Sequence, residues 1–177
     1  MNEQQIEVTS IDLRYQGCQI QNYKDEKHLL QGILDNGIQD PLQGVDNGDN
    51  KILLNGFKRL RCAKKLGINI VPYSSLSDDE ALGILQLLRM TNTQSLSILE
   101  QAKLIAELQS IYGLGNADIA RSLEKSKGWV SMRTGLLNQM SPYVISQIMN
   151  GAFPAYSYMY TLRPFMRMNA LSTGEMD

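Results

Sequence analysis

Residues 116–137 read NADIARSLEKSKGWVSMRTGLL, and the spacing of apolar residues in this stretch predicts two short helices that cross at a sharp angle. A close crossing needs a small residue inside the first helix, and Ala120 stands at that place. Ile119 and Leu123 are placed to fill the space between the helices, and Val130, ten residues after the alanine, is placed to anchor the second helix. The stretch therefore predicts a helix-turn-helix, a motif that lays its second helix in the major groove of DNA.

The early residues of the second helix are the expected DNA contacts, because they face base edges and phosphates in this motif. Two positions depart from the usual pattern: Glu124 stands where the turn often has glycine, and Arg133 stands where an apolar residue is usual. Trp129 is open to two interpretations, a DNA contact or a packing residue of the helix. A plain helical hairpin remains the alternative for the whole stretch. The predicted DNA-binding residues are Ser126, Lys127, Gly128, Trp129, Ser131, Met132 and Arg133.

The composition of the chain is that of a globular protein with one or two small domains. It has 177 residues, of which 43% are hydrophobic and 20% charged, and it contains no apolar run long enough to span a membrane. Two cysteines and one histidine are too few for a zinc site of the usual kind. The N-terminus lacks the pattern of a signal peptide, so a cytoplasmic protein with free thiols is expected.

Charge is distributed unevenly along a chain whose net charge is only −1. Residues 57–65 contain five basic residues and no acid, and they directly follow Gly56. A glycine between a strand and a helix lets backbone N–H groups at the helix start approach an anion. This turn is therefore a candidate phosphate site, although a solvated helix face is the simpler explanation.

The first half of the chain predicts strands interleaved with helices. Strands are expected over residues 6–13, 41–45, 51–54 and 68–73, with the second and third joined as a hairpin by the turn residues 46–50. Helices are expected over residues 25–36 and from Phe57 to Leu66, and each is followed by a glycine. In the first of them, one helical face carries the apolar residues Leu29, Leu30, Ile33 and Leu34. This half predicts a small α/β domain over residues 1–90.

The second half predicts helices only. Ser77 is expected to cap a helix that runs to about Met90, Ser97 and Glu100 form a capping-box pattern, and Asn116 is expected to cap the next helix. Further helices are expected over residues 128–140 and 142–150, the last with Ser141 as its cap. The fold class is therefore α/β followed by all-α, with a helical DNA-binding domain over residues 91–177.

In their order along the chain, four segments resemble the ParB family of chromosome and plasmid partition proteins. Residues 37–42 (GIQDPL) are similar to its Gly-x-x-Gln-Pro turn, residues 56–63 (GFKRLRCA) to its Gly-Glu-Arg-Arg-x-Arg-Ala-Ala turn, and residues 90–95 (MTNTQS) to its Glu-Asn-x-x-Arg segment, with the helix-turn-helix next. The resemblance implies a ParB/sulfiredoxin-like α/β domain and a helix-turn-helix domain. It also implies a homodimer that binds a palindromic duplex in partition or transcriptional regulation, and a partition ATPase as a further partner.

The same resemblance implies that CTP binds with Mg²⁺ at the glycine-basic turn. Several residues depart from the family pattern: Phe57 replaces an acid, Asp40 replaces a glutamine, and Thr91 and Ser95 replace the outer residues of the third segment. Ser95 stands in place of the family's arginine, and Asp40 adds a negative charge. Both changes make binding of a triphosphate less favourable, and its hydrolysis less favourable still. The implied nucleotide-binding residues are Gly37, Pro41, Gly56, Lys58, Arg59, Arg61 and Asn92.

Two other classes of function remain open. A ParB-fold enzyme that acts on nucleotides, as a CTPase, a nuclease or a kinase, needs an acid or base beside the basic turn, and Glu26, Asp40 and Asp46 are the nearby candidates. Their spacing indicates no particular chemistry, so no catalytic residue is predicted. A module whose helices bind only another protein is the second alternative.

Overall fold

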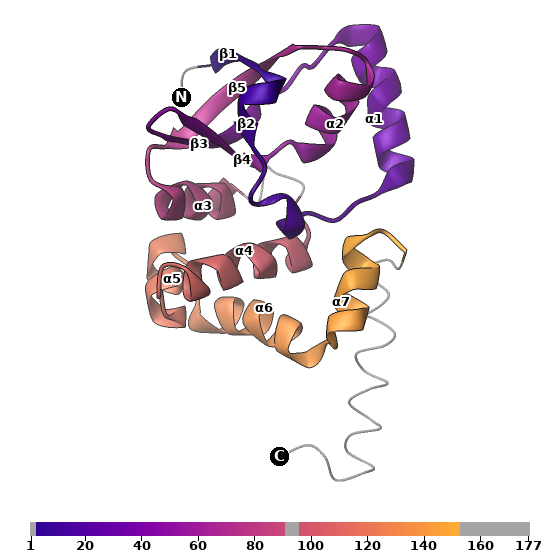
Figure 1. The fold of residues 1–177 in the computed structure, drawn as a ribbon. Helices are drawn as coiled ribbons and strands as arrows, with labels where there is room; N and C mark the ends of the chain where they lie inside the picture. The colour runs from indigo at the N-terminus through magenta and orange to yellow at the C-terminus, as the bar shows by residue number, and fades with distance from the viewer. Residues whose placement is uncertain (1–2, 91–95, 153–177) are drawn as a thin grey trace.

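The computed structural model describes residues 3–90 and 96–152, which form a mixed five-stranded sheet and a set of α-helices (Figure 1). Strand order in the sheet is β1-β5-β3-β4-β2. The strands are β1 (Glu3–Glu7), β2 (Ile11–Asp12), β3 (Leu42–Asn47), β4 (Asn50–Asn55) and β5 (Ile70–Ser77). The helices are α1 (Tyr23–Asn36), α2 (Phe57–Lys65), α3 (Glu80–Arg89), α4 (Ile98–Ser110), α5 (Asn116–Leu123), α6 (Lys127–Gln139) and α7 (Pro142–Met149).

Most of the sheet follows the prediction from the sequence. β3 and β4 pair antiparallel as the expected hairpin, and Gly48 takes a positive φ of 64° in its turn. β5 lies parallel to β3 and antiparallel to β1, and it extends further than expected, to Ser77. The prediction of one strand over residues 6–13 is wrong, because a 3-10 turn (η1, Val8–Ser10) separates β1 from β2 and sends the two to opposite edges of the sheet.

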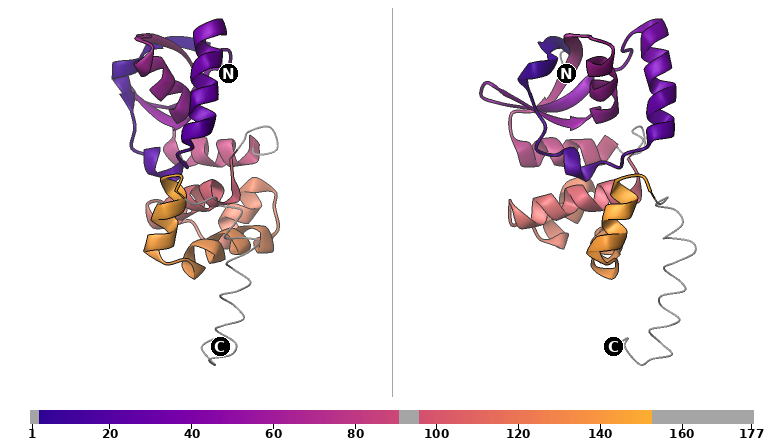
Figure 2. Two further views of the ribbon diagram at one scale, coloured as in Figure 1. Left: turned by 90° about the vertical axis from the view of Figure 1, so that its right-hand side faces the viewer. Right: turned by 45° about the vertical axis from the view of Figure 1, so that its right-hand side comes forward.

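Two helices lie side by side on one side of the sheet (Figures 1 and 2). α1 contains the predicted residues 25–36 and begins slightly earlier, at Tyr23, because Asn22 accepts a hydrogen bond from the Asp25 N–H and caps it. α2 follows β4 directly at Gly56, whose φ of 107° is in the left-handed region that favours glycine. The predicted switch from strand to helix at Gly56 is confirmed.

α3 lies between the sheet and the remaining helices (Figure 1). A Cβ atom at Gly83 would lie 2.2 Å from Cγ2 of Val45, so the backbone of α3 packs directly on β3. The predicted cap at Ser77 is wrong: Ser77 is the last residue of β5, and Asp79 accepts from the Leu82 N–H instead.

The helices after α3 form a second layer below the sheet and α3 (Figure 2). Ser97 and Glu100 form the predicted capping box of α4, and Ser141 caps α7 as expected. The predicted cap at Asn116 is wrong, since α5 begins at Asn116 and the preceding Gly115 N–H donates to Asp118 Oδ2 at 3.2 Å.

One hydrophobic core runs from the sheet through α3 into α4, α5 and α6. Arg89, the last residue of α3, donates from Nε to the carbonyl oxygen of Ser122 in α5 at 2.7 Å. The division of the chain at residue 90 remains a prediction. Within residues 3–90 and 96–152, no helix combines the length and the apolar character needed to span a bilayer.

Candidate nucleic-acid interface

α5 and α6 pack on each other through the apolar residues that the sequence singles out. Ile119, Ala120, Leu123 and Val130 are all buried, with at most 4% of any of these residues exposed. The connecting turn consists of Glu124, Lys125 and Ser126, and Glu124 takes a left-handed φ of 55°. The backbone thus makes the turn in the conformation that glycine favours, although the residue there is a glutamate.

The first turn of α6 presents an exposed, basic surface. The Ser126 hydroxyl accepts from the Trp129 N–H at 3.0 Å and caps the helix. Lys127, Gly128 and Ser131 are exposed, and Met132 is half-buried. A helix start with an adjacent lysine attracts anions, since free backbone N–H groups and the helix dipole both favour negative charge.

Arg133 does not share this exposed surface. Only 7% of the residue is accessible to solvent, and its Nε donates to Oε1 of Gln101, in α4, at 2.7 Å. A second guanidinium nitrogen donates to the backbone oxygen of Trp129 at 3.1 Å. A direct DNA contact by Arg133 is not supported by this placement, because the side chain is buried between α6 and α4.

Trp129 is half-buried, and two cations lie over its ring. The Arg133 guanidinium carbon is 3.5 Å from the ring centroid, and Lys125 Nζ is 5.6 Å from it. Trp129 thus packs against the hydrophobic core while part of the residue stays accessible to solvent, and its role as a DNA contact remains a prediction. Gln101 was not among the predicted residues, because nothing in its local sequence indicates a partner 32 residues away.

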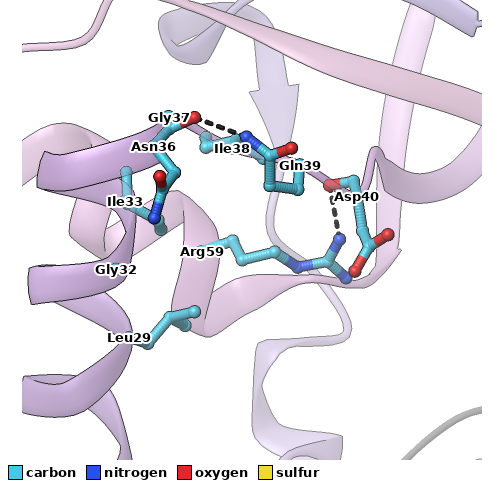
Figure 3. Close-up of a pocket in the computed structure, with 9 residues that line it drawn as sticks. All are labelled: Leu29, Gly32, Ile33, Asn36, Gly37, Ile38, Gln39, Asp40 and Arg59. Atoms are coloured by element: carbon cyan, nitrogen blue, oxygen red, sulfur yellow. Dashed lines mark hydrogen bonds between the residues drawn. The ribbon is translucent and has the colours of Figure 1, made fainter.

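The glycine-basic turn lies at the other end of the molecule, beside the C-terminal half of α1. Arg59, Gly37 and Asp40 line a hollow of about 230 Å³. Figure 3 shows the Arg59 guanidinium pointing toward Asp40. The Arg59 guanidinium donates to the backbone oxygens of Asp40 and Pro41 at 2.7 and 2.8 Å. Burial lowers the pKa of Arg59, while the neighbouring Asp40 opposes that shift. Arg59 thus fixes the turn at residues 40–41.

The other residues of this turn are also used within the fold. Arg61 forms an ion pair with Glu26, which is 5% exposed. Phe57, at the position of the family's acid, is 1% exposed and belongs to the core. Lys58, Arg59 and Arg61 are the basic residues of this turn that were predicted to bind nucleotide. Of these, Lys58 has neither a hydrogen bond nor an ion pair among the described residues. Asn92 lies outside the described residues.

These residues do not fit a nucleoside triphosphate in the arrangement described. Both predicted arginines are held by partners inside the protein, and an Asp40 carboxylate stands beside the hollow. A triphosphate needs several free cations or N–H donors to offset its charge. Neither Arg59 nor Arg61 is therefore free on the helix surface, while Gly37, Pro41 and Gly56 lie near one another around Arg59.

Comparison with known proteins identifies one related sequence and several related folds. The chain is 30% identical over 131 residues to the chromosome-partitioning protein Spo0J of Thermus thermophilus. That match covers 73% of this chain and 48% of Spo0J, so the chain spans about half the length of this relative. No protein-family model matches the chain.

Among solved structures, a Pnob8-like ParB-N domain is similar with a TM-score of 0.57 and 14% identity, over 99% of this chain and 83% of that one. A pNOB8-like ParB N-domain is similar with a TM-score of 0.50 and 16% identity, over 87% of this chain and 70% of that one. At these identities the similarity is one of fold, and it agrees with the mixed sheet and helices described above. With the sequence match to Spo0J, it follows that this chain belongs to the ParB family.

Proposed function

We propose that this protein binds double-stranded DNA through α5 and α6, with α6 as the recognition helix in the major groove. The observation that carries the proposal is the close packing of α5 on α6, which leaves Lys127, Gly128 and Ser131 exposed at the start of α6. In this role Lys127 contacts phosphate, and Ser131 and Met132 reach base edges. Gly128 has no neighbour that a Cβ atom would approach closer than 3.8 Å, so the backbone is open to DNA there.

We propose DNA partition as the biological role, on the evidence of the related sequence. Spo0J, to which the chain is 30% identical, is a chromosome-partitioning protein. We further propose that the chain acts as a homodimer on a palindromic site, because the two recognition helices of a dimeric helix-turn-helix protein bind two half-sites. Transcriptional regulation from the same site is compatible with these contacts.

The salt dependence of DNA binding tests this proposal. Duplexes are first selected from random DNA with the full chain, and binding of the selected duplex is then measured by fluorescence anisotropy at several salt concentrations. For Lys127→Ala we expect weaker binding and a slope of log K against log salt that is smaller by about 0.9, the value for one lost phosphate contact. Lys64→Ala, which removes an exposed lysine from α2, is the matched control and leaves the slope unchanged.

An unchanged slope in Lys127→Ala would remove this residue from the interface. Failure of the wild-type chain to bind any selected duplex would refute the DNA-binding proposal as a whole. It would favour the alternative in which the helices bind only protein.

Nucleotide binding is the second function that the family raises, and the occupied arginines argue against it. Isothermal titration with CTP and Mg²⁺ is expected to give no binding heat, as is a matched titration with ATP. Saturable heat with CTP alone would contradict this expectation and show that the turn at residues 40–41 rearranges to release Arg59.

A further inference from the structure

Arg133 is a buried cation that joins two helices of the DNA-binding half. From α6 it reaches Gln101 in α4, and Gln101 in turn donates from Nε2 to the backbone oxygen of Leu96 at 3.0 Å. Gln101 is itself buried, with 7% of the residue exposed. The chain of contacts therefore runs from the start of α4, through Arg133, to the ring and backbone of Trp129.

In the part of the chain that the structure describes, no carboxylate pairs with the charge of Arg133. Within residues 3–90 and 96–152, no Asp or Glu oxygen lies within 4.0 Å of its guanidinium. Burying an unpaired charge is unfavourable, and arginine keeps its proton at neutral pH. The Trp129 ring and two oxygen acceptors offset part of this penalty.

An apolar side chain would fill this position at a lower energetic cost, and an apolar residue is the usual occupant of this position in a helix-turn-helix. Arg133 is therefore not explained by packing stability. What it adds is geometry, because a planar guanidinium fixes the plane of the ring on which it stacks. The fixed ring lies at the turn between α5 and α6, where Lys125 and the cap Ser126 also lie.

We propose that Arg133 is a positioning residue for DNA binding, which holds Trp129 and the first turn of α6 against α4. Its effect on DNA passes through Trp129, whose ring also lies 5.6 Å from Nζ of Lys125 in the turn that leads into α6. This inference rests on the proposed DNA-binding function. It predicts that DNA affinity depends on Arg133 although Arg133 contacts no phosphate.

Trp129 is the one tryptophan of the chain, so its fluorescence reports directly on this contact. The experiment compares Arg133→Met, Arg133→Lys and the control Arg121→Met, which removes an exposed arginine that pairs with Asp118 on α5. Each variant is measured for urea unfolding, tryptophan emission and salt-dependent binding of the selected duplex. Arg133→Lys keeps the charge without the planar stack, and it keeps the test open if Arg133→Met does not fold.

For Arg133→Met we expect unfolding at the same or higher urea concentration, a shifted tryptophan emission and DNA binding about tenfold weaker with an unchanged salt slope. Arg133→Lys is expected to shift the emission and to bind DNA with an intermediate affinity. Arg121→Met leaves the emission unchanged.

Two results would overturn the inference while the wild-type chain still binds DNA. Wild-type affinity in Arg133→Met with a shifted emission would make Arg133 a packing residue only, and a slope smaller by about 0.9 would make it a direct phosphate contact. If the wild-type chain binds no duplex, the proposed function itself fails, and the DNA role of Arg133 fails with it.

Discussion

Glu124 holds the backbone conformation on which the turn from α5 to α6 depends. Its φ of 55° makes it the one described residue other than glycine with a positive φ. A Cβ atom is strained in this region, and glycine avoids that strain at some expense in chain entropy. We expect Glu124→Gly to raise the free energy of unfolding by about 0.5–1 kcal/mol, measured by urea denaturation.

The control for this residue is Glu124→Ala, which removes the same carboxylate but keeps the Cβ atom. This variant is expected to give no comparable rise in the free energy of unfolding. Equal gains in the two variants would trace the effect to charge instead of to backbone conformation.

Helix α3 shows at the scale of an element how packing overrides helix propensity. Gly83 lies inside α3, where alanine alone would favour the helix by about 1 kcal/mol. A Cβ atom there would meet Val45 at 2.2 Å, so we expect Gly83→Ala to lower the free energy of unfolding by about 1–3 kcal/mol. Gly32, inside α1, has nothing within 4 Å of a Cβ position, and Gly32→Ala is expected to raise it by about 0.5–1 kcal/mol. Thermal or urea unfolding of both variants checks that the free energy of unfolding changes in opposite directions. A higher free energy of unfolding in Gly83→Ala would contradict the close packing of α3 on β3.

At the scale of the whole molecule, Glu80 ties the two layers together. Its Oε2 accepts from the hydroxyls of Tyr15 and Tyr112 at 2.5 and 2.9 Å, and its Oε1 accepts from Arg14 at 2.9 Å. Tyr15 precedes η2 (Gln16–Cys18) in the first layer, whereas Tyr112 follows α4 in the second. Burial acts to raise the pKa of Glu80, but the hydrogen bonds from the two tyrosines and the charge of Arg14 outweigh it and lower the pKa.

A lowered pKa in the folded state means that Glu80 stabilises the fold above its unfolded pKa of about 4.3 and that this stabilisation disappears as the pH falls further. We expect Glu80→Gln to lower the free energy of unfolding by about 1–3 kcal/mol at neutral pH. As the pH falls, the free energy of unfolding of this variant is expected to decrease less than that of the wild type. Urea unfolding measured between neutral pH and acid checks this. Asp35→Asn, which removes an exposed carboxylate from α1, is the control. An unchanged acid dependence in Glu80→Gln would mean that Glu80 does not couple the layers.

The sequence by itself determined the features that depend on near neighbours. The Ser97–Glu100 capping box, the β3–β4 hairpin, the glycine switch at Gly56 and the buried spacing from Ile119 to Val130 are signals contained within a few residues to about a dozen. The order of strands and helices after α1 in the α/β part followed from them, whereas the single strand predicted over residues 6–13 is two strands at opposite edges of the sheet. The predicted helix caps at Ser77 and Asn116 were misplaced by two residues and one residue, because several neighbouring residues are able to cap and tertiary packing chooses between them.

Only the tertiary structure decided what the long basic side chains do. Arg59, Arg61 and Arg133 find their partners 18, 35 and 32 residues away in the chain, at Pro41, Glu26 and Gln101. Each side chain is long and flexible enough to reach solvent or the interior, and the free energy of the whole fold selects between these. A basic pattern in the sequence therefore predicts charge but not whether that charge is available to a ligand: Lys127 is exposed at the start of α6, whereas Arg133 is buried.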